Sequence, residues 1–124
     1  MRSVLLLTAF VLLAAAALAA DQPTATAAVC TAVKDRKPEG MAETFPANVG
    51  ELYCFSRLIN VTDKVMHVWF RADKEVFRIE LPVRAARWRT WSVKKVTPPM
   101  TGAWRVEVQD AAGAVLATAR FTVE

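Results

Sequence analysis

The chain has 124 residues, of which 54% are hydrophobic and 23% are charged, and its formal net charge is +4 at pH 7. This length gives room for one domain and excludes a large multidomain protein. The small positive charge gives only weak support for a polyanionic partner such as nucleic acid. With four glycines in the whole chain, no glycine-rich phosphate loop is present.

Residues 1–19 have the pattern of a secretory signal peptide. Arg2 supplies the positive start, residues 4–18 are almost wholly apolar, and Ala17-Leu18-Ala19 matches a cleavage site. The alternative is an uncleaved anchor, but an apolar run of about 15 residues is shorter than the roughly 20 that cross a bilayer. We therefore predict cleavage, which lowers the net charge from +4 to +3 by removing Arg2. The mature chain is expected to be exported, periplasmic or extracellular, without stable membrane insertion.

Short alternating segments fill the rest of the chain. We expect residues 20–27 to be a flexible mature N-terminus, and the proline- and glycine-punctuated stretch 34–50 to be a long loop. In residues 75–83 apolar side chains alternate with polar ones, which is the period of a half-buried strand. Similar patterns predict seven strands in all, at residues 28–33, 52–59, 65–72, 75–83, 87–96, 104–109 and 115–123.

Seven short strands within residues 28–124 predict a single all-β domain, an antiparallel β-sandwich of immunoglobulin-like type. A small barrel is the alternative. Cys54 on the second strand precedes Trp69 on the third, which is the order of an immunoglobulin core. Gly102-x-Trp104-x-Val106 occupies the place of the Gly-x-Tyr-x-Cys segment, so Val106 stands where the second cysteine of the inter-sheet disulfide would be.

Cys30 and Cys54 are the two cysteines of the chain. In an oxidising compartment an even pair predicts one disulfide, between the first and second strands. Closing a loop of about 25 residues would stabilise the fold by roughly 3 kcal/mol. Two buried free thiols are the alternative. Two cysteines and the single His67 offer too few ligands for a metal site, so we expect no metal and no cofactor.

Two stretches are candidates for a binding patch. On residues 65–72, His67, Trp69 and Arg71 share one face, where Arg stacking on Trp would suit a sugar ring or an anionic group. The structural alternative makes Trp69 the core tryptophan and His67 its buried neighbour. The second stretch is basic and aromatic. The full candidate patch is His67, Trp69, Arg71, Arg87, Trp88, Arg89, Trp91 and Lys94.

The stretch 87–96 mixes tryptophans with basic residues, as single-strand nucleic-acid grooves do. Export and the small net charge argue against nucleic acid as the partner. Trp88 and Trp91 are three residues apart, so on a regular strand they cannot share a face, and one of them lies outside unless the strand is bulged. The alternative is that the tryptophans anchor the core while the basic side chains are simply solvated.

Enzyme motifs are missing. Ser56 and Ser92 have no flanking nucleophile signature, and one histidine would have to serve every possible triad. We therefore expect a non-catalytic protein without a catalytic residue. Its partner is predicted to be an unknown protein or a cell-envelope glycan. The first hypothesis is a module that binds a protein or envelope partner. The alternative is a module that binds carbohydrate or an anionic polymer through exposed Trp and Arg side chains.

A set of motifs is spread over most of the chain after residue 34, and its fairly specific part is the tryptophan-rich segment. The motifs are Asp35-Arg36-x-Pro38, His67-x-Trp69, Arg87-Trp88-Arg89-Thr90-Trp91-Ser92-x-Lys94, Gly102-x-Trp104-Arg105-Val106-x-Val108, Asp110-x-x-Gly113 and Phe121-x-Val123. With these motifs the chain resembles a bacterial family known only as a domain of unknown function, number twenty-nine fourteen. The resemblance implies a secreted or cell-envelope module and carries no established activity.

Overall fold

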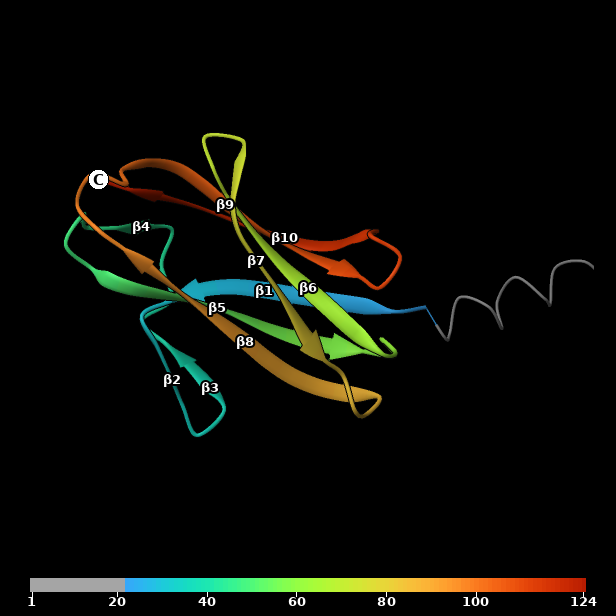
Figure 1. Ribbon diagram of the computed structural model, residues 1–124. Helices are drawn as coiled ribbons and strands as arrows, with labels where there is room; N and C mark the ends of the chain where they lie inside the picture. Colours follow the sequence, from blue (N-terminus) through green and yellow to red (C-terminus); the bar gives the residue numbers. More distant parts are fainter. Residues whose placement is uncertain (1–21) are drawn as a thin grey trace, which may run out of the picture.

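Residues 22–124, the part of the chain that the computed structural model describes, form ten strands and no helix (Figure 1). The predicted signal peptide lies outside the described residues. No helix within residues 22–124 could therefore span a membrane. The strands are β1 (Thr24–Cys30), β2 (Ala32–Lys34), β3 (Lys37–Glu39), β4 (Thr44–Phe45), β5 (Gly50–Ile59), β6 (Lys64–Arg71), β7 (Lys74–Pro82), β8 (Arg87–Val96), β9 (Gly102–Asp110) and β10 (Val115–Val123).

The strands form two larger sheets and one separate hairpin. One sheet has the order β1-β5-β8, the other β4-β10-β9-β6-β7, and β2 pairs with β3. Every pairing is antiparallel except the short parallel contact of β4 with β10. The orders β1-β5-β8 and β10-β9-β6 correspond to strands A-B-E and G-F-C of an immunoglobulin domain. The predicted antiparallel β-sandwich is confirmed, with three short strands, β2 to β4, in addition to the seven expected.

Side chains from both sheets meet in the core. Cys54 on β5, Trp69 on β6 and Val106 on β9 are fully buried and belong to one hydrophobic cluster. Phe121 of β10 meets Trp69 edge-on, with ring centroids 6.2 Å apart, and stacks on Trp104 at 5.7 Å. Burial of large rings of this kind is a leading favourable term in folding. Trp69 and Val106 occupy the core positions that the immunoglobulin analogy predicted.

The segment before β5 is more ordered than the sequence indicated. Residues 24–27, expected to be flexible, belong to β1 and pair with β5. The stretch 34–50, expected to be a loop, holds the turn of the β2–β3 hairpin, which extends away from the sandwich in Figure 1, and β4. Asp35 and Arg36 form that turn with positive φ angles of 52° and 60°. Neither residue is glycine, so the usual Asn-Gly signal of such a turn is missing.

The path of β7 determines which edges of the sandwich stay open. β7 pairs with β6 over its whole length instead of crossing to lie beside β8. In an immunoglobulin constant domain, the corresponding fourth strand lies beside the strand equivalent to β8. No described strand occupies that place here, so β8 pairs with β5 alone. β8 is therefore an edge strand, and all ten of its residues keep an unbroken register with β5.

Candidate functional site

The eight residues predicted as a binding patch do not form one surface. His67 and Trp69 lie on the inner face of β6, and both are 0% exposed. Met66 and Phe70, at the alternate positions of the strand, are half-buried. The sequence left open which set faces outward. Trp69 packs in the core cluster between the sheets, and its Nε1 donates to Ser92 on the opposite sheet, so this set faces inward. The part of the predicted patch that required exposed His67 and Trp69 is wrong.

His67 joins the two sheets through a buried hydrogen-bond cluster. Its Nε2 lies 2.7 Å from Ser56 Oγ on β5, and its Nδ1 lies 2.6 Å from Ser92 Oγ on β8. Trp69 Nε1 donates to the same Ser92 oxygen at 3.1 Å. Burial lowers the pKa of His67 to about 4, so the ring is neutral at pH 7. The cluster is therefore an uncharged polar link inside the sandwich.

Counting protons assigns the tautomer of His67. Trp69 Nε1 can only donate, so Ser92 Oγ accepts from it and keeps its own proton for His67 Nδ1. His67 Nε2 then carries the ring proton and donates to Ser56 Oγ, whose hydroxyl is left to bond the Cys54 thiol. The opposite tautomer would leave the Ser92 proton without an acceptor among these contacts. Although a serine beside a histidine resembles a nucleophile and its base, these side chains are buried away from any substrate.

Arg71 and Lys94 bond the backbone instead of standing free for a ligand. Arg71 Nε donates to the carbonyl oxygen of Thr101 at 2.9 Å, and its Nη2 donates to that of Pro99 at 3.1 Å. Arg71 thereby ties the turn before β9 to the end of β6. Lys94 Nζ donates to the carbonyl oxygen of Lys95 at 2.9 Å. Arg71 belongs to the other sheet, and Lys94 lies on the inner face of β8, away from Arg89 and Trp91, so neither joins the surface around those two residues.

The remaining residues of the predicted patch lie on β8, where successive side chains point to opposite faces of the sheet. Trp88 packs against the core cluster around Leu58 and Val108, so it faces inward. Trp91 is 37% exposed and faces outward. Because the register with β5 is unbroken, no bulge is needed to separate the two tryptophans. The outward-facing series of β8 is accordingly Arg87, Arg89, Trp91, Val93 and Lys95.

Aromatic rings cover the middle of this outer face. Trp91 lies opposite Phe55 of β5 in the register, and the two rings stack with centroids 6.0 Å apart and an interplanar angle of 13°. The guanidinium of Arg57 lies over the Phe55 ring, 5.5 Å from its centroid. Trp91 and Arg57 thus shield Phe55 from solvent, while the exposed part of the Trp91 ring remains available for contact.

Four arginines gather around one pocket at the end of this face. The pocket has a volume of about 410 Å³ and is lined by side chains from three elements, with no carboxylate among them. Arg89 Nη1 donates to the carbonyl oxygen of Arg36 at 3.0 Å, which fixes the β2–β3 hairpin against the sheet. The lining residues are Arg36, Arg57, Leu58, Ile59, Arg87, Trp88 and Arg89.

Arg57 and Arg89 are direct cross-strand partners in the register of β5 with β8. Like charges directly opposite each other on one face of an antiparallel pair are destabilising. The ion pairs formed by residues 22–124 involve neither of these arginines nor the other two that line the pocket. An anion bound between the two guanidinium groups would remove their repulsion.

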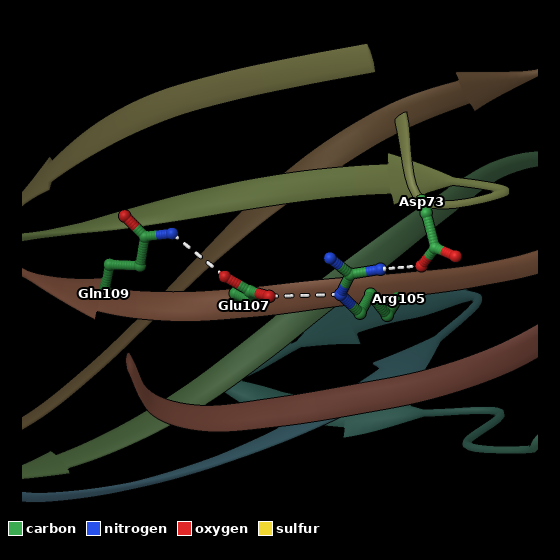
Figure 2. A network of polar contacts seen from close by, with 4 residues as sticks. All are labelled: Asp73, Arg105, Glu107 and Gln109. Atoms are coloured by element: carbon green, nitrogen blue, oxygen red, sulfur yellow. Dashed lines mark hydrogen bonds and ion pairs between the residues drawn. The ribbon is translucent and has the colours of Figure 1, made fainter. Parts of the chain in front are cut away.

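The outer face of the five-stranded sheet is arranged differently. Figure 2 shows Arg105 between Asp73 and Glu107, with hydrogen bonds of 2.6 Å and 3.0 Å. Gln109 donates to the other oxygen of Glu107 at 3.0 Å, and the Arg105 guanidinium lies 3.9 Å from the centroid of the Phe70 ring. Arg105 is therefore matched by carboxylates of its own sheet, whereas the four arginines of the pocket take part in none of the ion pairs formed by residues 22–124.

The cysteines are free thiols in the structure, and both are buried. Cys30 pairs with Tyr53, and Cys54 with Val29, so the two cysteines are one position out of register and point to opposite faces of the sheet. Cys54 belongs to the core, whereas the thiol of Cys30 bonds the backbone of the hairpin at Ala32 and Glu39. The disulfide that the sequence predicted is therefore absent. Burial, with a smaller contribution from Cys30, raises the pKa of Cys54 to about 12.

Two thiols are expected to react when the mature protein is unfolded and alkylated without reductant. The physical reason is the one-position offset of Cys30 from Cys54 across β1 and β5. Intact mass before and after labelling measures the number of added groups, and a reduced sample serves as the matched control. A mass unchanged by alkylation in the unreduced sample would show that the disulfide forms and that the local register of β1 differs.

Residues 22–124 contain no group of three or more His, Cys, Asp and Glu side chains that could hold a metal ion.

Fold and surface together define the class of this protein: an immunoglobulin-like β-sandwich domain with four arginines around one pocket of its three-stranded sheet. Residues 62–123 match the family described as protein of unknown function (DUF2914), and the chain belongs to this family. The match begins after β5, so the Asp35-Arg36-x-Pro38 segment of the resemblance lies outside it. No curated protein matches the chain.

The surface formed by the arginine pocket, Phe55 and Trp91, called here the arginine–aromatic face, includes three residues that were not part of the predicted patch. Phe55 lies on a strand with apolar residues on both faces, so alternation did not mark it as outward. Arg36 reaches the face only through the β2–β3 hairpin, which the sequence presented as loop. Arg57 joins the face because it lies opposite Arg89. Strand pairing, which no local pattern reports, brings these residues together.

Proposed function

We propose that this protein is an exported, non-catalytic binding module that takes an anionic partner of the cell envelope. The binding surface is the outer face of the β1-β5-β8 sheet, from the arginine pocket to Trp91. The observation that carries the proposal is the direct opposition of Arg57 and Arg89 in a pocket without carboxylates. Arginine presents five donors in a planar fork that fits carboxylate and phosphate groups, so this pocket is suited to such anions.

Affinity for an anion is expected to fall about 10- to 100-fold in the double variant Arg57→Gln, Arg89→Gln. The reason is the loss of two charge-assisted hydrogen bonds, which are weakened in a pocket open to solvent and together contribute about 1.4–2.7 kcal/mol. Calorimetric titration of the mature protein with inorganic tripolyphosphate and with polyglutamate measures the effect. Raising the salt concentration is expected to weaken binding further, since the pocket is open to solvent.

The matched control is Arg78→Gln, Arg120→Gln, which removes the same charge from the five-stranded sheet. Less than a threefold loss of affinity is expected there. Equal losses in the two double variants would mean that only net charge matters, and the pocket would then have no special role. Failure of both anions to bind the unmodified protein would overturn the proposal directly.

Carbohydrate is the second candidate, and the exposed ring of Trp91 is the observation that favours it. Sugar-binding platforms use exposed aromatic faces, but Trp69, the other ring proposed for this purpose, is buried. A neutral hexasaccharide such as cellohexaose tests the idea. Binding that Trp91→Ala abolishes and Arg57→Gln leaves intact would establish the carbohydrate module in place of the anion module.

A further inference from the structure

β8 is the longest of the edge strands in the described domain. β8 runs for ten residues, keeps an unbroken register with β5 and contains no proline. Within residues 22–124, the backbone hydrogen bonds formed outside the strand pairings include none made by residues 87–96. Those nearest to β8 are made by Ala86, just before it, and by Thr97, just after it. Half of the N–H and C=O groups of an edge strand point away from its partner, so β8 offers an open row of donors and acceptors.

The opposite sheet protects its long edge. β7 carries a register shift between Phe77 and Glu75 and ends at Pro82, and its side chains include both Lys74 and Glu80. Bulges, prolines and mixed charges of this kind prevent the addition of a further strand. On β1 the edge is already used in part, because Ala42 N donates to the carbonyl oxygen of Val29. β8 has neither a register shift nor a proline, and its charges are all of one sign, so its edge disfavours a basic strand but can admit an acidic one.

The charged side chains of β8 determine which kind of strand could pair with its edge. The strand carries Arg87, Arg89, Lys94 and Lys95 and contains no acidic residue. A second copy of the same strand would place like charges opposite each other, which disfavours self-pairing. An acidic strand would instead meet complementary charge. The Lys94 side chain lies on the inner face of the β1-β5-β8 sheet, at its edge strand, and an inward-pointing charge there also discourages pairing between copies.

The outward-facing side chains of β8 also indicate which side chains a partner strand would carry. Arg87 and Arg89 come first, and Trp91 and Val93, which are 37% and 41% exposed, follow at the next two outward positions. Side chains of an added strand alternate between faces, so every second residue would meet this series. The pattern fits two acidic residues followed by two apolar residues at alternate positions.

We propose that an extended acidic segment of a partner protein adds to the edge of β8 as a fourth strand, with its carboxylates facing Arg87 and Arg89 and its apolar side chains beside Trp91 and Val93. This inference rests on the proposed function and narrows the anionic partner to a protein. Recognition then has two parts. Backbone hydrogen bonds provide sequence-independent affinity, and the arginine–aromatic face selects the partner.

A synthetic peptide tests the proposal on the mature protein. In this peptide every second residue is threonine, and the positions between carry two glutamates followed by two valines. A second peptide with the reversed sequence tests the opposite strand direction. In one of the two directions, binding is expected to slow amide hydrogen exchange at every second residue of 87–96. Methylating one alternate set of peptide amides is expected to weaken binding more than about 10-fold, and methylating the other set less than about threefold, since only one set faces β8.

The outcomes separate this inference from the proposed function. If both methylated peptides bind like the parent peptide while Arg57→Gln, Arg89→Gln removes binding, strand addition is wrong and the anion site stands. If alternate methylation matters but the arginine variant binds the peptide normally, the edge pairs with peptides without charge selection, and the acidic partner is overturned while tripolyphosphate binding decides the anion site separately. Tripolyphosphate binding without any peptide binding would likewise exclude the protein partner.

Discussion

Replacing Trp69 with alanine is expected to destabilise the domain by about 3–5 kcal/mol, the range for removing a large buried ring. Trp69 is fully buried, packs edge-on against Phe121 and donates from Nε1 to Ser92 Oγ. The variant would lose the packing and also leave the Ser92 oxygen without this donor. The midpoint and slope of urea unfolding, followed by circular dichroism, measure the change in free energy.

Two further variants separate the contributions to this effect. Trp69→Phe keeps an aromatic ring in the core but removes the indole donor, so it is expected to lose less than half as much stability. Trp91→Ala removes an exposed tryptophan from the outer face and is expected to cost about 1 kcal/mol, because Phe55 beneath it becomes more exposed. If Trp69→Ala proved no more harmful than Trp91→Ala, the assignment of Trp69 to the core would be wrong.

The stability of the domain is expected to fall as the pH drops from 6.5 to 4, with His67 contributing about 3 kcal/mol of the change. Burial lowers its pKa from an ordinary value of 6.5 to about 4 in the folded protein. Between these two values the unfolded chain binds more protons than the folded one, so stability decreases as pH falls. Above pH 6.5 the ring is neutral in both states, and this contribution is fully present.

Urea unfolding at a series of pH values tests this expectation, and His67→Gln isolates the contribution of the imidazole. Acidic residues also titrate below pH 5, and the variant retains them. A smaller slope of stability against pH between 6.5 and 4 is therefore expected for His67→Gln than for the unmodified protein. Identical slopes would show that His67 has the same pKa in the folded and unfolded states, in conflict with its burial between two serines.

Prediction from the sequence was most accurate where one strand carries a complete local signal. The bounds of β8 and β10 were predicted residue for residue, because alternating side chains and flanking turn residues mark both ends. Gly113, with a φ of 91°, forms the predicted turn before β10. The hairpin of β2 with β3 was missed, since Asp35 and Arg36 turn the chain without the glycine that usually indicates such a turn.

For the candidate site, alternation divided the side chains of each strand into two faces but could not choose which face lies inside. On β6 both faces are rich in apolar residues, so the choice between Trp69 and Met66 depended on the opposite sheet. On β8, three-residue spacing correctly required Trp88 and Trp91 to lie on different faces. Only the packing of Trp88 against the core cluster left Trp91 as the exposed ring.

By itself, the sequence determined the all-β class, the family and most strand positions of this protein, because these depend on local alternation, turn residues and motif spacing. The tertiary structure decided the arginine pocket, the unpaired edge of β8 and the absence of the disulfide. Each of these depends on which strands lie side by side and in what register. A shift of one residue reverses every side chain of a strand, so that the same composition gives a different surface.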